Sequence, residues 1–166
     1  MIPTLHIICV EDETAVLDAV LRDLRPFEDS FRLSGAGDAA EAREIIAGLD
    51  AETDRVALIY CDHIMPGERG VDLLIDLHGS ENPVLAHTRK VLFTGQAGHD
   101  DTITAINRAG LNHYVEKPWE AAAFVALTKK LLTDYVLAAH LPVMSFMAVL
   151  ETERLADALH DDETLS

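Results

Sequence analysis

The feature that most constrains the fold of this chain is an alternation of short apolar runs with longer amphipathic segments. The apolar runs are too short for buried helices, and runs of this length are typical of strands in a parallel sheet buried on both faces. Five strands are predicted, over 5–10, 31–36, 56–61, 90–93 and 113–116. Helical spacing of apolar residues predicts helices over 14–24, 38–49, 71–78, 100–109 and 119–140. Thr14 and Asp38 are the predicted N-caps of the first two helices. Such alternation predicts an α/β fold, a doubly wound five-stranded parallel sheet covered by helices on both faces.

Length and composition limit the number of domains and the class of function. A chain of 166 residues is about one domain, and 49% hydrophobic residues are ample for a packed core. The formal net charge of −16 argues against nucleic-acid binding, because a module that binds DNA or RNA presents a basic face. Cys9 and Cys61 lack metal-binding spacing and fall in predicted buried strands, where a free thiol usually packs as a small hydrophobe.

Signals for secretion or membrane insertion are missing from the sequence. The first residues lack the basic start and the cleavage site of a signal peptide. The most apolar region, 135–150, is interrupted by His140, Pro142 and Ser145 and falls short of the ~20 apolar residues of a membrane-spanning helix. We therefore expect a cytoplasmic protein that makes no membrane contact.

Polar side chains that can carry chemistry follow four of the five predicted strands. Glu11 and Asp12 follow the first strand, and Asp62 comes directly after the third. Thr94 follows the fourth strand and Lys117 follows the fifth. The carboxyl ends of parallel strands meet at one edge of the sheet, which is where open α/β sheets bind ligands. We therefore expect these five side chains to converge.

The chemistry of this predicted cluster favours phosphoryl transfer. Three converging carboxylates repel one another and raise at least one pKa unless a cation lies among them. Oxygen ligands of this kind suit Mg²⁺, which also keeps several waters. Carboxylates, a metal, an ammonium and a hydroxyl together form a site for a transferred phosphoryl group. Each residue alone is unremarkable, since an aspartate before a turn is usually a cap, so the prediction rests on their coincidence.

The sequence over 4–132 resembles the receiver domain of two-component response regulators. The matching positions, in the family's order and spacing, are the acidic pair Glu11–Asp12, the phosphoacceptor Asp62 followed by two residues and Met65-Pro66-Gly67, the later Gly70, the switch hydroxyl Thr94, the switch aromatic Tyr114 and the pair Lys117–Pro118. The resemblance implies the flavodoxin-like strand order 2-1-3-4-5 for the sheet.

The resemblance also implies how the metal and the phosphoryl group are held. Asp62 would accept a phosphoryl group from the phosphohistidine of a sensor histidine kinase. Mg²⁺ would be bound by Asp12, Asp62 and the backbone carbonyl of Ile64, with Glu11 acting through water.

Three further positions receive roles from the same resemblance. Thr94 and Lys117 would bind the phosphoryl oxygens. Tyr114 would turn inward as Thr94 moves toward the phosphoryl group. Beside these motifs, we expect His63 to be a turn residue that points to solvent, and Trp119 to pack at the start of its helix.

The final segment extends past the family's domain, which ends near Leu132. We therefore divide the chain into a receiver domain, 1–132, and a helical extension, 133–166. Pro142 is well placed to begin a helix, and apolar residues follow it with a slip in register. This helix either folds back on its own domain or forms a homodimer or partner surface, and the many large apolar side chains favour a symmetric homodimer.

Taken together, the residues predict a stand-alone receiver that is not an enzyme. It would accept a phosphoryl group on Asp62 and signal by contact with a downstream protein. Alternatives within the family are a phosphorelay intermediate and the receiver part of a longer regulator whose output domain lies beyond this chain. A magnesium-dependent phosphatase with Asp62 as nucleophile is disfavoured, because such enzymes usually carry a second aspartate two residues on, where this chain has Ile64.

Overall fold

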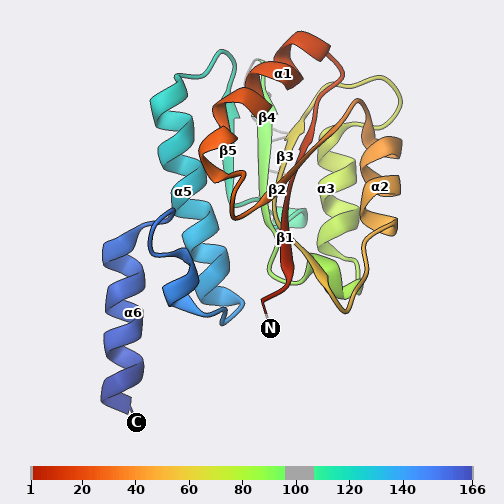
Figure 1. The fold of residues 1–166 in the computed structure, drawn as a ribbon. Coiled ribbons are helices and arrows are strands. Elements are labelled where there is room, and N and C mark those ends of the chain that lie inside the picture. The colour runs from red at the N-terminus through yellow and green to blue at the C-terminus, as the bar shows by residue number, and fades with distance from the viewer. Residues whose placement is uncertain (1, 96–106, 166) are drawn as a thin grey trace.

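A five-stranded, all-parallel sheet forms the centre of the molecule in a computed structural model that describes residues 2–95 and 107–165 (Figure 1). The strand order is β2-β1-β3-β4-β5. The strands are β1 (Thr4–Val10), β2 (Arg32–Ala36), β3 (Asp54–Asp62), β4 (Arg89–Thr94) and β5 (His113–Glu116). The predicted doubly wound fold and its strand order 2-1-3-4-5 are confirmed.

Helices cover both faces of this sheet, as the right-handed crossovers between parallel strands require. On one face lie α1 (Thr14–Asp23) and α5 (Ala121–Ala138), and on the other lie α2 (Ala39–Ala47) and α3 (Gly70–His78) (Figure 1). The last helix, α6 (Thr152–Leu165), lies outside α5. Short 3-10 helices cover Arg25–Phe27, Pro83–Leu85 and Val143–Phe146. Most of the helix predicted over 100–109 lies outside the described residues.

Local sequence explains where two of these helices begin. Asp38 is the N-cap of α2, and its Oδ1 accepts a hydrogen bond of 2.8 Å from the backbone N–H of Glu41, as predicted from its type and place. The prediction that Thr14 caps α1 is wrong by one residue. Glu13 occupies that cap position without a side-chain cap bond, and Thr14 is the first residue of the helix.

Two apolar clusters, one on each face of the sheet, form the core. Along β1 the side chains alternate, so that Ile7 and Cys9 join the cluster under α1 and α5, while Ile8 and Val10 join the one under α2 and α3. Burial raises the pKa of the Cys9 thiol well above its ordinary value, and it does the same to Cys61. Both cysteines are therefore inert core side chains, as the sequence indicated.

The tail after α5 folds back on its own domain. Phe146, Leu150 and Leu155 are almost fully buried and belong to the same cluster as α1 and α5. The ring of Phe146 lies 5.9 Å from the ring of Phe31, which immediately precedes β2. The tail thus completes the core on this face.

The form of the tail differs from the predicted single helix that begins at Pro142. A short 3-10 helix, Val143–Phe146, comes first, and α6 begins only at Thr152. The slip in register is the reason, because no single helix face can bury both Phe146 and Leu155. The surface invoked for a homodimer is thus partly covered within one chain. The boundary at residue 132 stays a prediction, and it falls inside α5.

The burial of Phe146 predicts a large cost for its truncation. Phe146→Ala should lower the free energy of unfolding by about 3 kcal/mol, because it leaves a cavity between the tail and the sheet face. Met144→Ala is the matched control, since Met144 is 68% exposed, and it should stay within about 0.5 kcal/mol of wild type. Urea unfolding measures both. Equal midpoints for the two variants would show that the tail does not pack as described.

Candidate functional site

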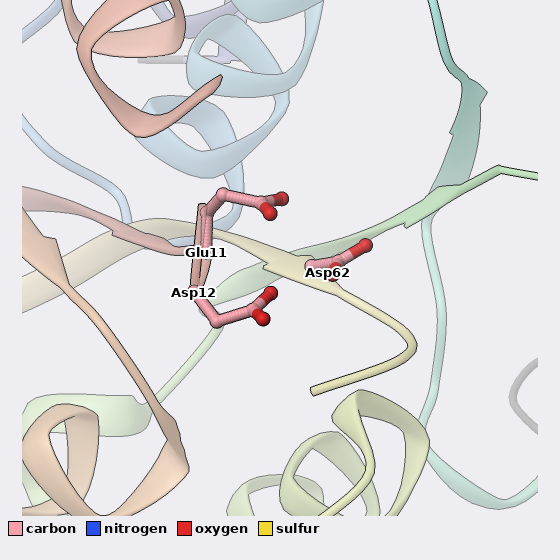
Figure 2. A group of neighbouring side chains, drawn as sticks. All are labelled: Glu11, Asp12 and Asp62. Atoms are coloured by element: carbon pink, nitrogen blue, oxygen red, sulfur yellow. The ribbon is translucent and has the colours of Figure 1, made fainter. Parts of the chain in front are cut away.

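Three carboxylates meet at the carboxyl ends of β1 and β3 (Figure 2). These strands are neighbours, with Val10 opposite Cys61, so Glu11 and Asp12 follow β1 beside Asp62, the last residue of β3. One oxygen from each carboxylate lies within 4.8 Å of the other two. Glu11 and Asp62 are buried, whereas Asp12 is exposed. The predicted convergence of these three residues is what the structure shows.

Lys117 joins two of these carboxylates from the end of β5. Its Nζ donates to Glu11 Oε2 at 2.7 Å and lies 3.0 Å from Asp62 Oδ1. Burial lowers the pKa of Lys117, but the hydrogen bonds to Glu11 and Asp62 outweigh burial, so the pKa rises above its ordinary value. Burial raises the pKa of Glu11, and the hydrogen bond from Lys117 offsets only part of that rise. The pocket thus holds a fixed ammonium.

Thr94 supplies a buried hydroxyl beside this group. It ends β4, one residue beyond the position paired with Asp62, and its carbonyl accepts a hydrogen bond of 2.9 Å from Lys117 N. Thr94 is 3% exposed, and in the described part of the protein its Oγ1 has no hydrogen-bond partner. Buried hydroxyls nearly always have a hydrogen-bond partner, so an unbonded one calls for an explanation. The Thr94 hydroxyl can donate to an oxygen of a ligand that binds beside Asp62.

Two other predicted residues, Tyr114 and Ile64, are exposed. Tyr114 is on the edge strand β5, 43% exposed, with its ring 5.9 Å from that of His113. Ile64 lies in the loop after β3, and its side chain is 70% exposed. Tyr114 thus occupies an outward position rather than the inward one implied for the phosphorylated family member.

The loop between β3 and α3 depends on two motif glycines. A Cβ on Gly70 would lie 2.0 Å from the carbonyl oxygen of Asp62, so only glycine allows α3 to start this close to the strand end. Gly67 has φ +85°, in the region that glycine adopts without strain. The prediction that His63 points to solvent is wrong, since it is 7% exposed. The reason is that pairing continues past Asp62, with His63 N donating to Phe93 O at 3.1 Å.

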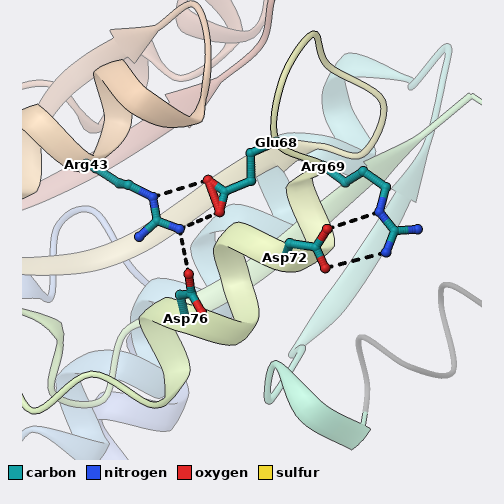
Figure 3. Close-up of polar contacts among 5 residues, drawn as sticks. All are labelled: Arg43, Glu68, Arg69, Asp72 and Asp76. Carbon is teal, nitrogen blue, oxygen red and sulfur yellow. Dashed lines mark hydrogen bonds and ion pairs between the residues drawn. The ribbon is translucent and has the colours of Figure 1, made fainter.

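An arginine from α2 holds the same loop from outside (Figure 3). Arg43 Nε donates to Glu68 at 3.2 Å, and its Nη2 donates to Glu68 and, at 2.7 Å, to Asp76 of α3. Arg69 and Asp72 form a separate pair at the start of α3. No sequence signal marks Arg43, because its partners lie 25 and 33 residues away.

Trp119 anchors the segment that carries Lys117. Its ring packs against Phe93 and Phe124, as expected for a residue at the start of a helix, and its Nε1 donates to Asp23 Oδ2 at 2.8 Å. The Lys117–Pro118 peptide bond is cis. These contacts tie the position of Lys117 to the end of α1.

Comparison with known sequences decides the family. A profile of the response regulator receiver domain matches residues 7–129, most of the chain. The chain belongs to the response regulator receiver domain family. The matched range contains the acidic pair, Asp62, Thr94 and Lys117.

Similar proteins include longer regulators. The chain is 30% identical over 113 residues to the hydrogenase transcriptional regulatory protein HoxA of Cupriavidus necator, which covers 68% of this receiver and 21% of HoxA. It is 30% identical over 118 residues to the transcriptional regulatory protein DpiA of Escherichia coli, covering 71% of this chain and 48% of DpiA. The receiver thus spans between about a fifth and a half of the length of these relatives.

Solved structures agree on the fold. The signal receiver domain of an HD domain-containing protein from Pseudomonas fluorescens superimposes with a TM-score of 0.72 at 21% identity, covering 84% of this chain and 95% of that one. At this identity the likeness establishes the fold alone. Across the described residues of the receiver, no helix combines the length and apolar character needed to span a membrane.

The raised pKa of Glu11 predicts a specific pH dependence for the metal-free receiver. A carboxyl whose folded-state pKa exceeds its unfolded value of 4.5 binds its proton more readily when folded, so stability rises as pH falls through the raised pKa and stops rising below 4.5. Glu11→Gln lacks this contribution. Urea unfolding in EDTA should therefore show wild type gaining stability relative to Glu11→Gln between neutral pH and about pH 5. Parallel pH profiles for the two proteins would contradict the assignment.

Proposed function

We propose that this receiver accepts a phosphoryl group on Asp62 from the phosphohistidine of a sensor histidine kinase and signals by contact with a downstream protein. The observation that carries this proposal is the Lys117 ammonium between Glu11 and Asp62, beside the buried hydroxyl of Thr94, which has no hydrogen-bond partner among the described residues. A nucleophilic carboxylate, a fixed cation and a free donor are the groups that a phosphoryl acceptor needs.

The transfer step uses these side chains directly. A carboxylate oxygen of Asp62 attacks phosphorus, a new O–P bond forms, and the P–N bond breaks with its electron pair returning to the imidazole nitrogen of the kinase. Lys117, 3.0 Å from Asp62 Oδ1, orients the carboxylate and then attracts the phosphoryl oxygens. The Thr94 hydroxyl donates a hydrogen bond to one of those oxygens, a partner that the described residues do not supply.

The acidic cluster fits Mg²⁺, since three carboxylates within 4.8 Å of one another offer the hard oxygen ligands that this ion takes. We propose that Asp12, Asp62 and the backbone carbonyl of Ile64 hold the ion, with Glu11 acting through water. When bound, Mg²⁺ would neutralise negative charge on the phosphoryl oxygens.

Signal output is proposed to follow from Thr94. Once Thr94 bonds the phosphoryl group, Tyr114 would turn inward on the neighbouring strand β5 and change the surface offered to a partner. We place the receiver in the cytoplasm, without enzymatic activity of its own. Phe146 and Leu150 are buried within one chain, so they offer no surface for a homodimer through α5 and α6.

A second candidate function is that of the receiver part of a longer regulator. It is favoured by the relatives HoxA and DpiA, each named a transcriptional regulatory protein and each at least about twice the length of the matched region. In that case the phosphorylated receiver would control an output domain in the same polypeptide.

Phosphorylation chemistry provides the first test of this function. Incubation with acetyl phosphate and Mg²⁺ should add one phosphoryl group to the wild-type protein, and Asp62→Asn should remove that labelling because an amide oxygen is a poor nucleophile. Intact-protein mass spectrometry measures the adduct. Wild-type labelling of Asp62→Asn would place the phosphoacceptor elsewhere.

Metal binding provides a second test. Mg²⁺ at about ten times its dissociation constant should stabilise the fold by about 1.4 kcal/mol, and Asp12→Asn should lose most of that gain. Asp18→Asn, which removes an exposed carboxylate from α1, is the matched control and should keep it. Thermal unfolding with and without Mg²⁺ gives the answer. If the wild-type melting temperature is unmoved by Mg²⁺, the three carboxylates do not form its site.

The lifetime of the phosphorylated form depends on Ile64. This apolar, 70% exposed side chain lies two residues past Asp62 and cannot position an attacking water. We expect slow self-dephosphorylation that becomes several-fold faster in Ile64→Asn and stays near wild type in Ile64→Val. Decay of the labelled protein over time measures all three rates. A wild-type rate above that of Ile64→Asn would refute the role given to Ile64.

A further inference from the structure

A cavity distinct from the side-chain cluster around Asp62 lies at the opposite end of β4. Its volume is about 330 Å³, it is open to solvent, and it is lined by the end of α3, the segment 85–90 and the segment 110–112 that precedes β5. Lys90 and Thr94 are four residues apart on the same strand, which separates the two sites by about 13 Å. A ligand here would therefore be distinct from a phosphoryl group on Asp62.

The charge of this cavity is opposite to that of the protein. All its ionisable lining residues are basic, namely His78, His87, Arg89 and Lys90, and the described residues contribute no carboxylate to its lining. The chain as a whole carries a formal net charge of −16, with 29 acidic and 13 Lys or Arg residues. Four basic side chains thus surround one hollow of a strongly acidic protein, which favours a negatively charged ligand at this place.

Lys90 is the most unusual member of this group. It is 7% exposed, and its Nζ donates to the carbonyl oxygen of Thr88 at 3.1 Å and lies 3.5 Å from His78 Nδ1. No carboxylate of the described chain lies within ion-pair distance of it. A buried ammonium without a counter-charge is costly, and burial, followed by the charge of Arg89, lowers the pKa of Lys90 to about 8.

A second cationic residue of the cavity has a buried donor atom without a hydrogen bond among the described residues. The Nε of Arg89 is buried, and it makes no hydrogen bond in the described structure. Asn112 and Ser80 add an amide and a hydroxyl to the lining. The hydrogen bond from Lys90 to Thr88 gives Lys90 a structural role. It does not explain why the Nε of Arg89 is unbonded. An anion in the cavity would supply a counter-charge to both Lys90 and Arg89, which line it.

We propose that this cavity binds a small anion of the phosphate class, either inorganic phosphate or the phosphomonoester group of a small molecule. Arginine, lysine and histidine commonly donate hydrogen bonds to phosphate oxygens. Together they offer more positive charge than a carboxylate ligand would balance, which favours phosphate over a carboxylate. The volume exceeds that of phosphate alone and lies at the lower end of the range for small-molecule pockets. Leu77, Leu85 and Ala86 offer apolar contact to a sugar-sized body.

The test is a titration of the full chain, in phosphate-free buffer with EDTA, by inorganic phosphate and separately by ribose 5-phosphate. Calorimetry should show saturable binding of at least one probe, and ribose without phosphate should not bind. Amide NMR shifts should centre on Lys90 and Asn112 and spare Thr94 and Lys117. Tighter binding of ribose 5-phosphate identifies a phosphomonoester ligand, whereas equal affinities identify phosphate itself.

Variants assign the binding to this cavity. Lys90→Met keeps all but the last atom of the buried side chain and should weaken binding about tenfold or more, because it removes a charge-assisted hydrogen bond. Arg89→Gln, at a half-buried position, should weaken it several-fold and carries the test if Lys90→Met fails to fold. Lys129→Met, on α5, is the matched control and should bind as wild type. Absence of saturable binding by both probes at millimolar concentration, unchanged affinity in Arg89→Gln, or shifts centred on Thr94 and Lys117 would each overturn the proposal.

Discussion

The rest of the site depends on the ion pairs that the Lys117 ammonium forms with Glu11 and Asp62. The ammonium contacts Glu11 and Asp62, whose carboxylates otherwise repel each other at the ends of adjacent strands. It also arrives from β5 through a segment that Trp119 and its bond to Asp23 hold in place. The strands β1, β3 and β5 are thus tied at one edge by a single cation, and the same cation lies where a phosphoryl group on Asp62 would need it.

Much of this edge follows from the sequence, since strand ends in a parallel sheet share one side. The apolar run before Asp62 and the pairs Glu11–Asp12 and Lys117–Pro118 therefore located the pocket. The burial of His63 could not be predicted from the sequence, because it depends on one additional backbone hydrogen bond to β4, from His63 N to Phe93 O. The bridge from Arg43 to Glu68 joins residues whose contact is tertiary. The break before α6 reflects packing on Phe31, which no helical period encodes.

Two lysines on neighbouring strands illustrate how surroundings decide the behaviour of one side-chain type. Both are desolvated, but Lys117 has two carboxylate partners and its pKa rises, whereas the pKa of Lys90 falls to about 8. The first is neutralised within the chain. The second is buried without a counter-charge among the described residues, at the far end of β4. Lys117 is therefore part of an ion pair within the chain. Lys90 is the one for which we propose an anion from outside the chain.

The most direct test of the central claim is a crystal structure of the protein with Mg²⁺ and beryllofluoride, which mimics a phosphoryl group on aspartate. The account predicts beryllium bonded to an Asp62 carboxylate oxygen, with one fluorine accepting from Thr94 Oγ1 and another within hydrogen-bond distance of Lys117 Nζ. If Asp62 carries no adduct, or if Thr94 Oγ1 stays without a partner while Lys117 remains on Glu11 alone, these side chains do not form a phosphoryl-binding site.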